Sequence, residues 1–192
     1  MNLELLSPAG NFESVKVAIA NGADAVYLGA KLFNARKRAD NLDDDELFKA
    51  CEYAHIFGKK VYLTVNTILG GDNFGDLYNL ITSAISAKVD AYIIQDLGVL
   101  QFIKSHFSGL ELHASTQMAI HNVQGCIMAK KLGFTRVVLS RETPLEEIRK
   151  IKESVDIELE YFIQGALCVA FSGNCYLSAA LKGESGNKGR CL

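Results

Sequence analysis

Several features that would assign a protein class are missing from this sequence of 192 residues. No apolar run approaches the roughly 18 residues that a membrane-spanning helix requires. The opening residues Met1 to Glu4 lack the basic start of a secretory signal peptide, and the five cysteines are an odd number, which argues against a disulfide framework. We therefore expect a cytoplasmic protein with reduced thiols and no membrane partner.

The sequence also lacks a strong net charge and several common motifs. The net charge of -2 gives no reason to expect general binding to polyanions, so any contact with nucleic acid would need a local patch. No Gly-x-Gly-x-x-Gly follows the first predicted strand, and neither His-Glu-x-x-His nor Gly-x-Ser-x-Gly occurs. These absences argue against a dinucleotide-binding fold, a zinc peptidase and an α/β-hydrolase.

Short β-branched runs alternate with amphipathic stretches along the chain. Strands are predicted near Glu4–Leu6, Ala25–Leu28, Val61–Val65, Ala91–Ile94, Glu111–His113, Arg136–Leu139 and Glu158–Ile163. Helices are predicted near Phe12–Asn21, Asp44–Phe57, Phe74–Lys88, Gly98–Phe107, Val123–Leu132 and Leu145–Glu153. A repeated βα unit whose strands are apolar on both faces predicts a parallel sheet covered by helices.

Two helix starts are marked by capping residues. Asp43 stands three residues before Glu46, which is the spacing of a capping box. Thr143, Pro144 and Glu146 predict a cap, a proline at the first helical position and a carboxylate at the third.

The strand count determines the expected architecture. Seven strands are predicted, whereas a (β/α)8 TIM-type barrel has eight. We expect residues 1–192 to form a single barrel domain that is cut before its last strand and before the rest of a longer protein. A doubly wound open sheet is the alternative. Because an unclosed barrel exposes the edges of its first and seventh strands, the fragment is expected to self-associate.

Polar residues follow the predicted strands, where barrel enzymes place their active sites. They are Ser7, Asn34, Arg36, Asn66, Gln95, Asp96, His113, Ser115, Gln117, Ser140, Arg141 and Glu142. Arg36 and Arg141 could each bind a phosphate or carboxylate bidentately. The alternatives are a solvated loop for Arg36 and an internal ion pair for Arg141. His113 is the candidate general acid or base.

A second candidate site is a group of cysteines. Cys168, Cys175 and Cys191 lie in a glycine-rich stretch at intervals of six and fifteen residues. Inert thiols, structural zinc, a catalytic cysteine and an iron–sulfur cluster are all open interpretations, although zinc ligands usually come in closer pairs and a catalytic cysteine needs a base. An iron–sulfur cluster tolerates irregular spacing. Cys51 and Cys126 are instead predicted to pack in the core.

Several segments resemble the collagenase-like peptidase family, U32. The most specific is Glu160-x-Phe162-x-x-Gly165-Ala166-Leu167-Cys168-x4-Gly173-x-Cys175-x-Leu177-Ser178. The others are residues 5–11, 21–27, 58–66 and 136–142, so that the resemblance spans nearly the whole chain. One departure is Gln164, which stands where many members have histidine.

The resemblance implies an iron–sulfur protein for the oxygen-independent hydroxylation of a tRNA or rRNA base, because better understood relatives modify RNA in this way. In those relatives four cysteines hold a [4Fe-4S] cluster. By resemblance, Cys168, Cys175 and Cys191 match three of the ligands, and the fourth is expected beyond Leu192. Zinc is the alternative metal.

The same resemblance implies roles for the other candidate residues. The RNA-directed relatives depend on prephenate, so Arg36 and Arg141 would hold an anionic co-substrate of this kind or a phosphate, and His113 would move protons. Two other functions stay open. One is a collagenase-like peptidase, the assignment that the family's name records, and the other is a non-catalytic scaffold subunit whose cluster only stabilises the fold.

Overall fold

The fold is an α/β half-barrel, seen in a computed structural model that describes residues 3–35, 40–165, 168–186 and 190. Within these ranges one sheet contains β1 (Leu6–Pro8), β2 (Ala25–Gly29), β3 (Lys60–Val65), β4 (Ala91–Ile94), β5 (Leu112–Ala114), β6 (Arg136–Val138) and β7 (Glu158–Glu160). The strands lie side by side in chain order, and every neighbouring pair is parallel. Sequential order confirms the predicted TIM-like α/β class and contradicts the doubly wound alternative, whose strand order reverses.

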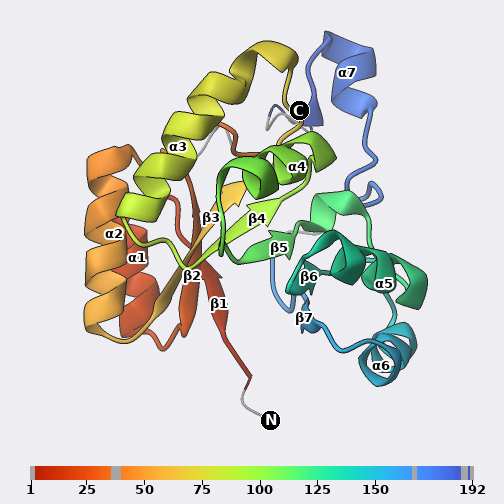
Figure 1. Cartoon of the computed structure of the whole chain (residues 1–192). Coiled ribbons are helices and arrows are strands. Elements are labelled where there is room, and N and C mark those ends of the chain that lie inside the picture. The colour runs from red at the N-terminus through yellow and green to blue at the C-terminus, as the bar shows by residue number, and fades with distance from the viewer. Residues whose placement is uncertain (1–2, 36–39, 166–167, 187–189, 191–192) are drawn as a thin grey trace.

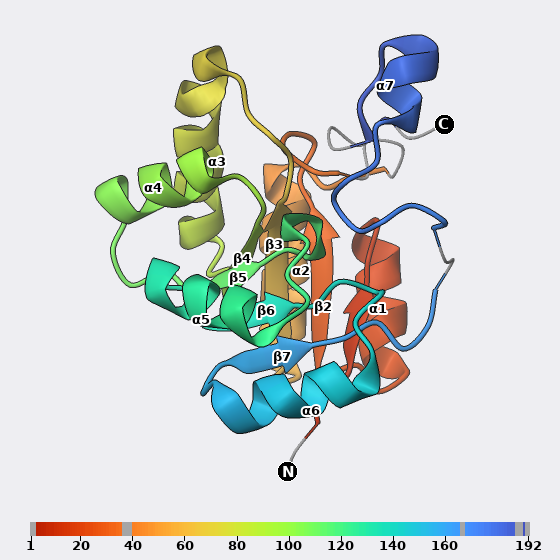
Figure 2. The same ribbon diagram turned by 90° about the vertical axis from the view of Figure 1, so that its right-hand side faces the viewer.

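Helices surround the outer face of this curled sheet (Figure 1). Those on this face are α1 (Phe12–Ala20), α2 (Asp44–Ile56), α3 (Phe74–Ser86), α4 (Leu97–His106), α5 (Val123–Leu132) and α6 (Leu145–Ser154). The described ranges also contain α7 (Leu177–Lys182) and the short 3-10 turns η1 (Gly71–Asn73) and η2 (Thr116–Met118). Figures 1 and 2 place α7 at the opposite end of the molecule from the N-terminus. None of the helices in the described ranges has the length and apolarity that crossing a bilayer demands.

The two faces of the sheet bury different side chains because successive strand residues point in opposite directions. In β3, Val61, Leu63 and Val65 belong to the large core under the helices. Tyr62, between them, belongs to a small cluster on the inner face together with Ala25 and the β4 residue Ile93. The large core holds the fold together by apolar burial, and the inner face combines the small cluster with the polar residues His113 and Arg136, which contact Tyr62.

Local signals predicted most elements to within two residues. The capping box of α2 is confirmed: Glu46 N donates to Asp43 Oδ1 at 3.0 Å, and Asp43 N donates to Glu46 Oε2 at 3.2 Å. The predicted Thr143 cap of α6 is wrong. Pro144 occupies the cap position without a side-chain hydrogen bond, and Thr143 is buried instead.

Two strand predictions and one missing helix also need correction. The first strand is Leu6–Pro8 rather than Glu4–Leu6, and the last ends at Glu160 rather than Ile163. Helix α7 was not predicted, since six residues are too few for a helical period to be recognised among the glycines around them.

Candidate functional site

Parallel strands bring their carboxyl ends to one edge of the sheet, and the polar residues that follow them meet there. Gln95 and Asp96 follow β4, Gln117 lies in η2 after β5, and Arg141 follows β6. Asp96 is committed to the backbone, because its carboxylate accepts from Gly98 N at 2.6 Å and also from Val99 N and Leu69 N. Asp96 therefore fixes the start of α4, and its carboxylate is already occupied by backbone donors. The carboxamides of Gln95 and Gln117 are not occupied in this way by the described residues.

An open depression of about 430 Å³ lies at this edge. Its lining consists of Ile68, Gln95, Asp96, Leu97, Gln117 and Met118. The Oε1 atoms of Gln95 and Gln117 are both buried and accept no hydrogen bond from the described part of the chain. The depression is therefore shallow and largely apolar, and the two carboxamide oxygens without donors belong to residues of its lining.

Residues 168–175, here called the cysteine segment, dock on the same edge through Ser172. Its side chain is buried, and its N and Oγ donate to Glu142 Oε1 at 3.0 and 3.2 Å. Arg141 N and Nε donate to Ser172 Oγ at 3.3 and 3.2 Å, and its Nη2 donates to Ala170 O at 3.4 Å. Arg141 and Glu142 therefore hold the segment rather than each other.

A second contact brings the cysteine segment against η2. Gly173 has a φ of +75°, and a Cβ added there would collide with the backbone carbonyl of Gln117. Only glycine tolerates both that conformation and that approach. The ring of Phe171 also meets His121 edge-on, with centroids 5.9 Å apart. Gln117 contacts Gly173 through its backbone and also lines the depression, so the cysteine segment lies directly beside the depression.

The cysteines fall into two groups by burial. Cys51 in α2 and Cys126 in α5 are fully buried, as predicted, and burial raises their thiol pKa values to about 12 and about 11. Cys168 is a free, exposed thiol, and Cys175 is a free, half-buried one. Cys191 lies outside the described residues. Inside them, no three His, Cys, Asp or Glu side chains gather as metal ligands would.

His113 lies elsewhere than expected, because β5 runs one residue further and ends at Ala114. The imidazole is fully buried, its Nε2 is 3.0 Å from Glu111 Oε1, and its ring meets Tyr62 edge-on at 4.9 Å. Burial lowers its pKa, so the neutral form is favoured. Its Nδ1 has no partner among the described residues. His113 is thus an interior residue and not part of the exposed edge.

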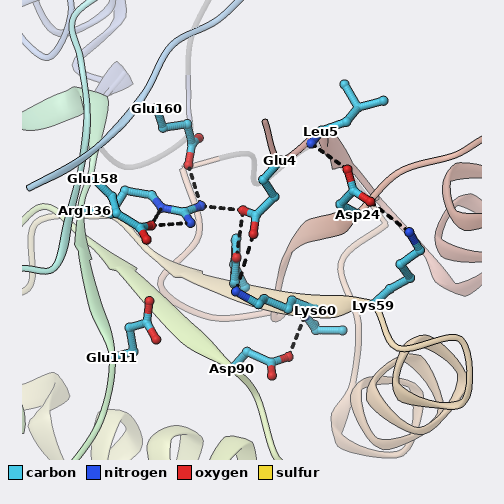
Figure 3. A network of polar contacts seen from close by, with 12 residues as sticks. Glu4, Leu5, Asp24, Lys59, Lys60, Asp90, Glu111, Arg136, Glu158 and Glu160 are labelled. Atoms are coloured by element: carbon cyan, nitrogen blue, oxygen red, sulfur yellow. Dashed lines mark hydrogen bonds and ion pairs between the residues drawn. The ribbon is translucent and has the colours of Figure 1, made fainter. Parts of the chain in front are cut away.

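Beside His113, at the amino ends of the strands, lies a network around the buried Arg136 (Figure 3). Its Nη1 donates to Glu4 Oε1 at 2.6 Å, and its Nε and Nη2 donate to Glu158 Oε2 at 2.9 and 2.6 Å. Tyr62 OH donates to Glu4 Oε1 at 2.8 Å, and Glu160 Oε2 lies 3.7 Å from Arg136 Nη1. We call these five residues the arginine network.

The arginine network contains an unusual carboxyl group. Burial raises the pKa of Glu160 to about 7; attraction to Arg136 only partly offsets this, and the negative charge of Glu4 adds to it. For Glu4, burial acts in the same direction, but hydrogen bonds from Arg136 and Tyr62 outweigh it and lower the pKa. The sequence analysis missed this network, although Glu158 and Glu160 flanking Leu159 in a strand do signal an acidic face.

The loop that leads to Arg36 is tied to the same sheet edge as the depression. Asn34 Oδ1 accepts from Thr64 Oγ1 at 3.2 Å, and Ala35 N donates to Asn66 Oδ1 at 3.0 Å. Arg36 itself lies outside the described residues. The predicted pairing of Arg36 with Arg141 around one anion therefore stays a prediction.

Comparison with known proteins identifies relatives over nearly the whole chain. The model described as peptidase family U32 matches residues 10–192. A 23S rRNA 5-hydroxycytidine synthase of Escherichia coli is 44% identical over 98% of this chain and 28% of its own length. A tRNA hydroxylation protein of Bacillus subtilis is 39% identical over 98% of this chain and 44% of its own.

Other relatives carry a different activity in their names. An uncharacterized protease of Methanocaldococcus jannaschii is 44% identical over 99% of this chain and 47% of its own length. A solved structure of a U32 peptidase has a TM-score of 0.70 at 14% identity, covering 83% of this chain and 68% of that one, which supports the fold alone. The chain spans less than half the length of the sequence relatives named here.

Proposed function

We propose, since this chain belongs to peptidase family U32, that it acts in the oxygen-independent hydroxylation of a tRNA or rRNA base and carries an iron–sulfur cluster. Relatives named for rRNA and tRNA hydroxylation support the RNA substrate. The cluster is supported by the cysteine pattern and not by those names.

One structural observation favours this function above the others. The cysteine segment is docked against the carboxyl-end depression by Ser172 and Gly173, so two free thiols are held beside a pocket that could receive a substrate. Glycine at 173 and a buried serine at 172 would be unnecessary if Cys168 and Cys175 belonged to a loose surface loop. We infer that the docking serves to place these thiols.

The donor set suits an iron–sulfur cluster. Thiolates are the usual ligands of such clusters, and Cys168, Cys175 and Cys191 would provide three of them, with the fourth from outside residues 1–192. Cys51 and Cys126 are unsuitable because burial keeps them protonated. When bound, the cluster would supply electron transfer beside the depression. Zinc on the same thiols is the alternative.

The chain's own residues would position the reacting groups. Arg141 holds the cysteine segment and places a cation near the carboxyl edge. We propose that Arg141 and Arg36 together attract an anionic co-substrate such as prephenate. The proton-transfer role of His113 stays a prediction, and its neutral, buried imidazole would have to act from inside the half-barrel. A serine–histidine peptidase is less favoured, because His113 pairs with Glu111 and Ser115 Oγ accepts from Gln117 N.

We also propose that an eighth strand completes the barrel. In the described residues β1 pairs with β2 alone and β7 with β6 alone, so both edges are open to another strand. The likeness to a solved U32 peptidase supports a barrel-like fold. If no strand covers these edges, the isolated chain should self-associate in ultracentrifugation.

The decisive experiment measures iron, acid-labile sulfide and zinc in the full-length protein purified without oxygen, together with the hydroxylated nucleotide in cellular RNA. We expect about four iron and four sulfide per chain. Cys175→Ala should lose the cluster and the modified nucleotide while keeping its circular dichroism spectrum, whereas Cys126→Ala should keep both.

Three results would overturn the proposal in different ways. Zinc without iron would remove the redox function. Gelatin or peptide hydrolysis that survives iron removal would return the peptidase to first place. Global unfolding of the Cys175→Ala variant would identify the cluster as a structural element of a scaffold subunit.

A further inference from the structure

The turn between β6 and α6 is fixed firmly to the rest of the half-barrel. Ser140 N donates to Ile120 O at 2.9 Å, and Thr143 N donates to Ser140 O at 3.0 Å, which closes the turn. Ser140 and Thr143 are buried, and Tyr161 OH lies 3.2 Å from Thr143 O. Side chains that project from this turn therefore start from a rigid base.

The cysteine segment, in contrast, has little regular structure of its own. None of its residues belongs to a helix or a strand. Inside the segment, Asn174 N donates to Phe171 O at 3.1 Å, and Asn174 Nδ2 lies 3.5 Å from Ser172 O. These two contacts do not define the conformation of the whole segment, so its placement depends on contacts with the rest of the molecule.

The central external contact joins Ser172 to Glu142. Only 1% of Ser172 is exposed, and both of its donors end on one oxygen, Glu142 Oε1, with N at 3.0 Å and Oγ at 3.2 Å. Within the described ranges neither donor has another acceptor. Because a buried donor without an acceptor is costly, loss of the Glu142 carboxylate would disfavour the docked conformation.

This contact restrains Cys175 more closely than Cys168. Cys175 follows Ser172 by three residues, and Gly173, between them, lies against the backbone carbonyl of Gln117. Two residues of chain span at most about 7 Å, so Cys175 Cα stays within that distance of Gly173 Cα. Cys168 precedes Ser172 by four residues, and its thiol is exposed whereas Cys175 is half-buried.

We propose that Glu142 is a positioning residue for Cys175: through Ser172 it holds the cysteine segment in one docked conformation, so that this ligand is in place when a cluster binds. Such preorganisation reduces the ordering cost of binding. A metal site without it must recover that cost from the binding free energy itself. The inference rests on the proposed function for the identity of the bound group.

The first measurement is thiol reactivity in full-length protein from which a chelator has removed all metal without oxygen present. Iodoacetamide labelling is followed at each cysteine by peptide mass spectrometry. In Glu142→Ala, Cys175 should be labelled about 10-fold faster than in wild type, because two buried donors lose their acceptor. Cys168 is already exposed, so its rate should change by less than about 2-fold.

Two further variants separate positioning from a general effect of the substitution. Glu142→Gln keeps an acceptor oxygen without the charge, so the labelling rate of Cys175 should return to within about 3-fold of wild type. Glu153→Ala removes a carboxylate from an exposed position of α6 and is the matched control, with wild-type labelling expected. Thermal melts of all three variants should match wild type, since both glutamates are exposed.

The second measurement uses the protein purified with its cluster. Release of iron to the chelator bathophenanthroline should be about 10-fold faster in Glu142→Ala, because the docked conformation is less populated. Glu142→Gln should again lie close to wild type, and Glu153→Ala should be indistinguishable from it.

Equal labelling of Cys175 in wild type and in Glu142→Ala would overturn the inference. Equal acceleration at Cys168 and Cys175 would also overturn it, because that result marks general unfolding. Labelling needs no bound metal, so a wild type without iron would remove the proposed function, while protection of Cys175 by Glu142 would still establish the positioning role. Iron in the wild type with unchanged labelling and release in Glu142→Ala would keep the function and remove that role.

Discussion

The two ends of the sheet bury different polar groups, mainly charged at the amino ends and neutral at the carboxyl ends, although Glu160 Oε2 and His113 Nδ1 on the amino side also lack a hydrogen-bond partner among the described residues. At the amino ends, Arg136 is buried but donates three hydrogen bonds to Glu4 and Glu158. At the carboxyl ends, Gln95, Gln117 and Ser140 each keep a buried polar oxygen that no described residue satisfies. In barrel-like folds the amino face generally contributes stability and the carboxyl face carries function.

The contacts at the amino ends hold together parts of the chain that are far apart in sequence. The arginine network joins sequence positions 132 residues apart, since Glu4 precedes β1 and Arg136 lies in β6. It therefore links the two sides of the half-barrel from within. Among the described residues, the carboxyl edge has no comparable ion-pair network, and it holds the cysteine segment through the smaller contacts of Ser172 and Gly173.

The largest expected effect is the loss of Arg136. Arg136→Met removes the cation that contacts Glu160 and leaves Glu4 with only Lys60, whose Nζ lies 3.5 Å from Glu4 Oε2, so the free energy of unfolding should fall by about 3–5 kcal/mol. Urea unfolding at pH 7 measures it. Arg149→Met, on an exposed position of α6, is the control and should change the value by less than about 0.5 kcal/mol. A similar small change in both variants would contradict a stabilising amino end.

The second prediction concerns the pH dependence of Glu160. The folded protein keeps this carboxyl protonated up to a pKa of about 7, whereas the unfolded chain releases the proton near 4.5. Ionisation therefore removes stability as the pH rises between those values, by about 3 kcal/mol in total. Glu160→Gln cannot ionise, so it should match wild type near pH 4 and be more stable by up to about 3 kcal/mol at pH 8.

Urea unfolding from pH 4 to pH 9 tests this sign. His113 also titrates with a shifted pKa, but it is present in both proteins and cancels in the difference between them. Glu158→Gln is the matched control. Glu158 is more exposed than Glu160 and accepts hydrogen bonds from Arg136, so its replacement should not stabilise the folded protein at pH 8. A Glu160→Gln variant less stable than wild type at pH 8 would refute the prediction.

The third prediction tests the docking of the cysteine segment. Gly173→Ala introduces a collision with Gln117 and a strained positive φ, and it should lower the opening free energy of residues 168–175 by about 2 kcal/mol or more. Hydrogen exchange of that segment measures the change. Gly183→Ala has a similar φ of +65° but open space around it, so it should cost only about 1 kcal/mol locally. Equal effects at the two glycines would mean that the contact with Gln117 is unimportant.

The smallest effect is expected at Ser172. Ser172→Ala removes the hydroxyl that accepts from Arg141 and donates to Glu142, at a cost of about 1 kcal/mol to docking of the segment. Hydrogen exchange should detect faster opening of residues 168–175 with no change in the core strands. Ser105→Ala, an exposed hydroxyl on α4, serves as control. Unchanged exchange in Ser172→Ala would assign the docking to Gly173 alone.

Local patterns were sufficient for much of the fold. The parallel α/β class, the seven strands and the capping box of Asp43 and Glu46 follow from apolar runs and spacings within a few residues. The burial of Cys51 follows from the apolar stripe of its helix, and that of Cys126 from its place in mid-helix beside apolar neighbours. The predicted cap at Thr143 failed where the structure buries Thr143, in a turn whose Arg141 and Thr143 carbonyl oxygens lie 3.1 and 3.2 Å from Tyr161 OH.

The sequence by itself determined which residue types this protein has available: polar residues after the strands, two arginines, and cysteines among glycines. Only the tertiary structure decided their use. It placed His113 inside the half-barrel, turned Arg141 toward the cysteine segment, and brought Gln95 and Gln117 to one depression. The physical reason is that strand propensity and helix caps act over a few residues, whereas burial and hydrogen-bond pairing depend on chain segments that meet only after folding.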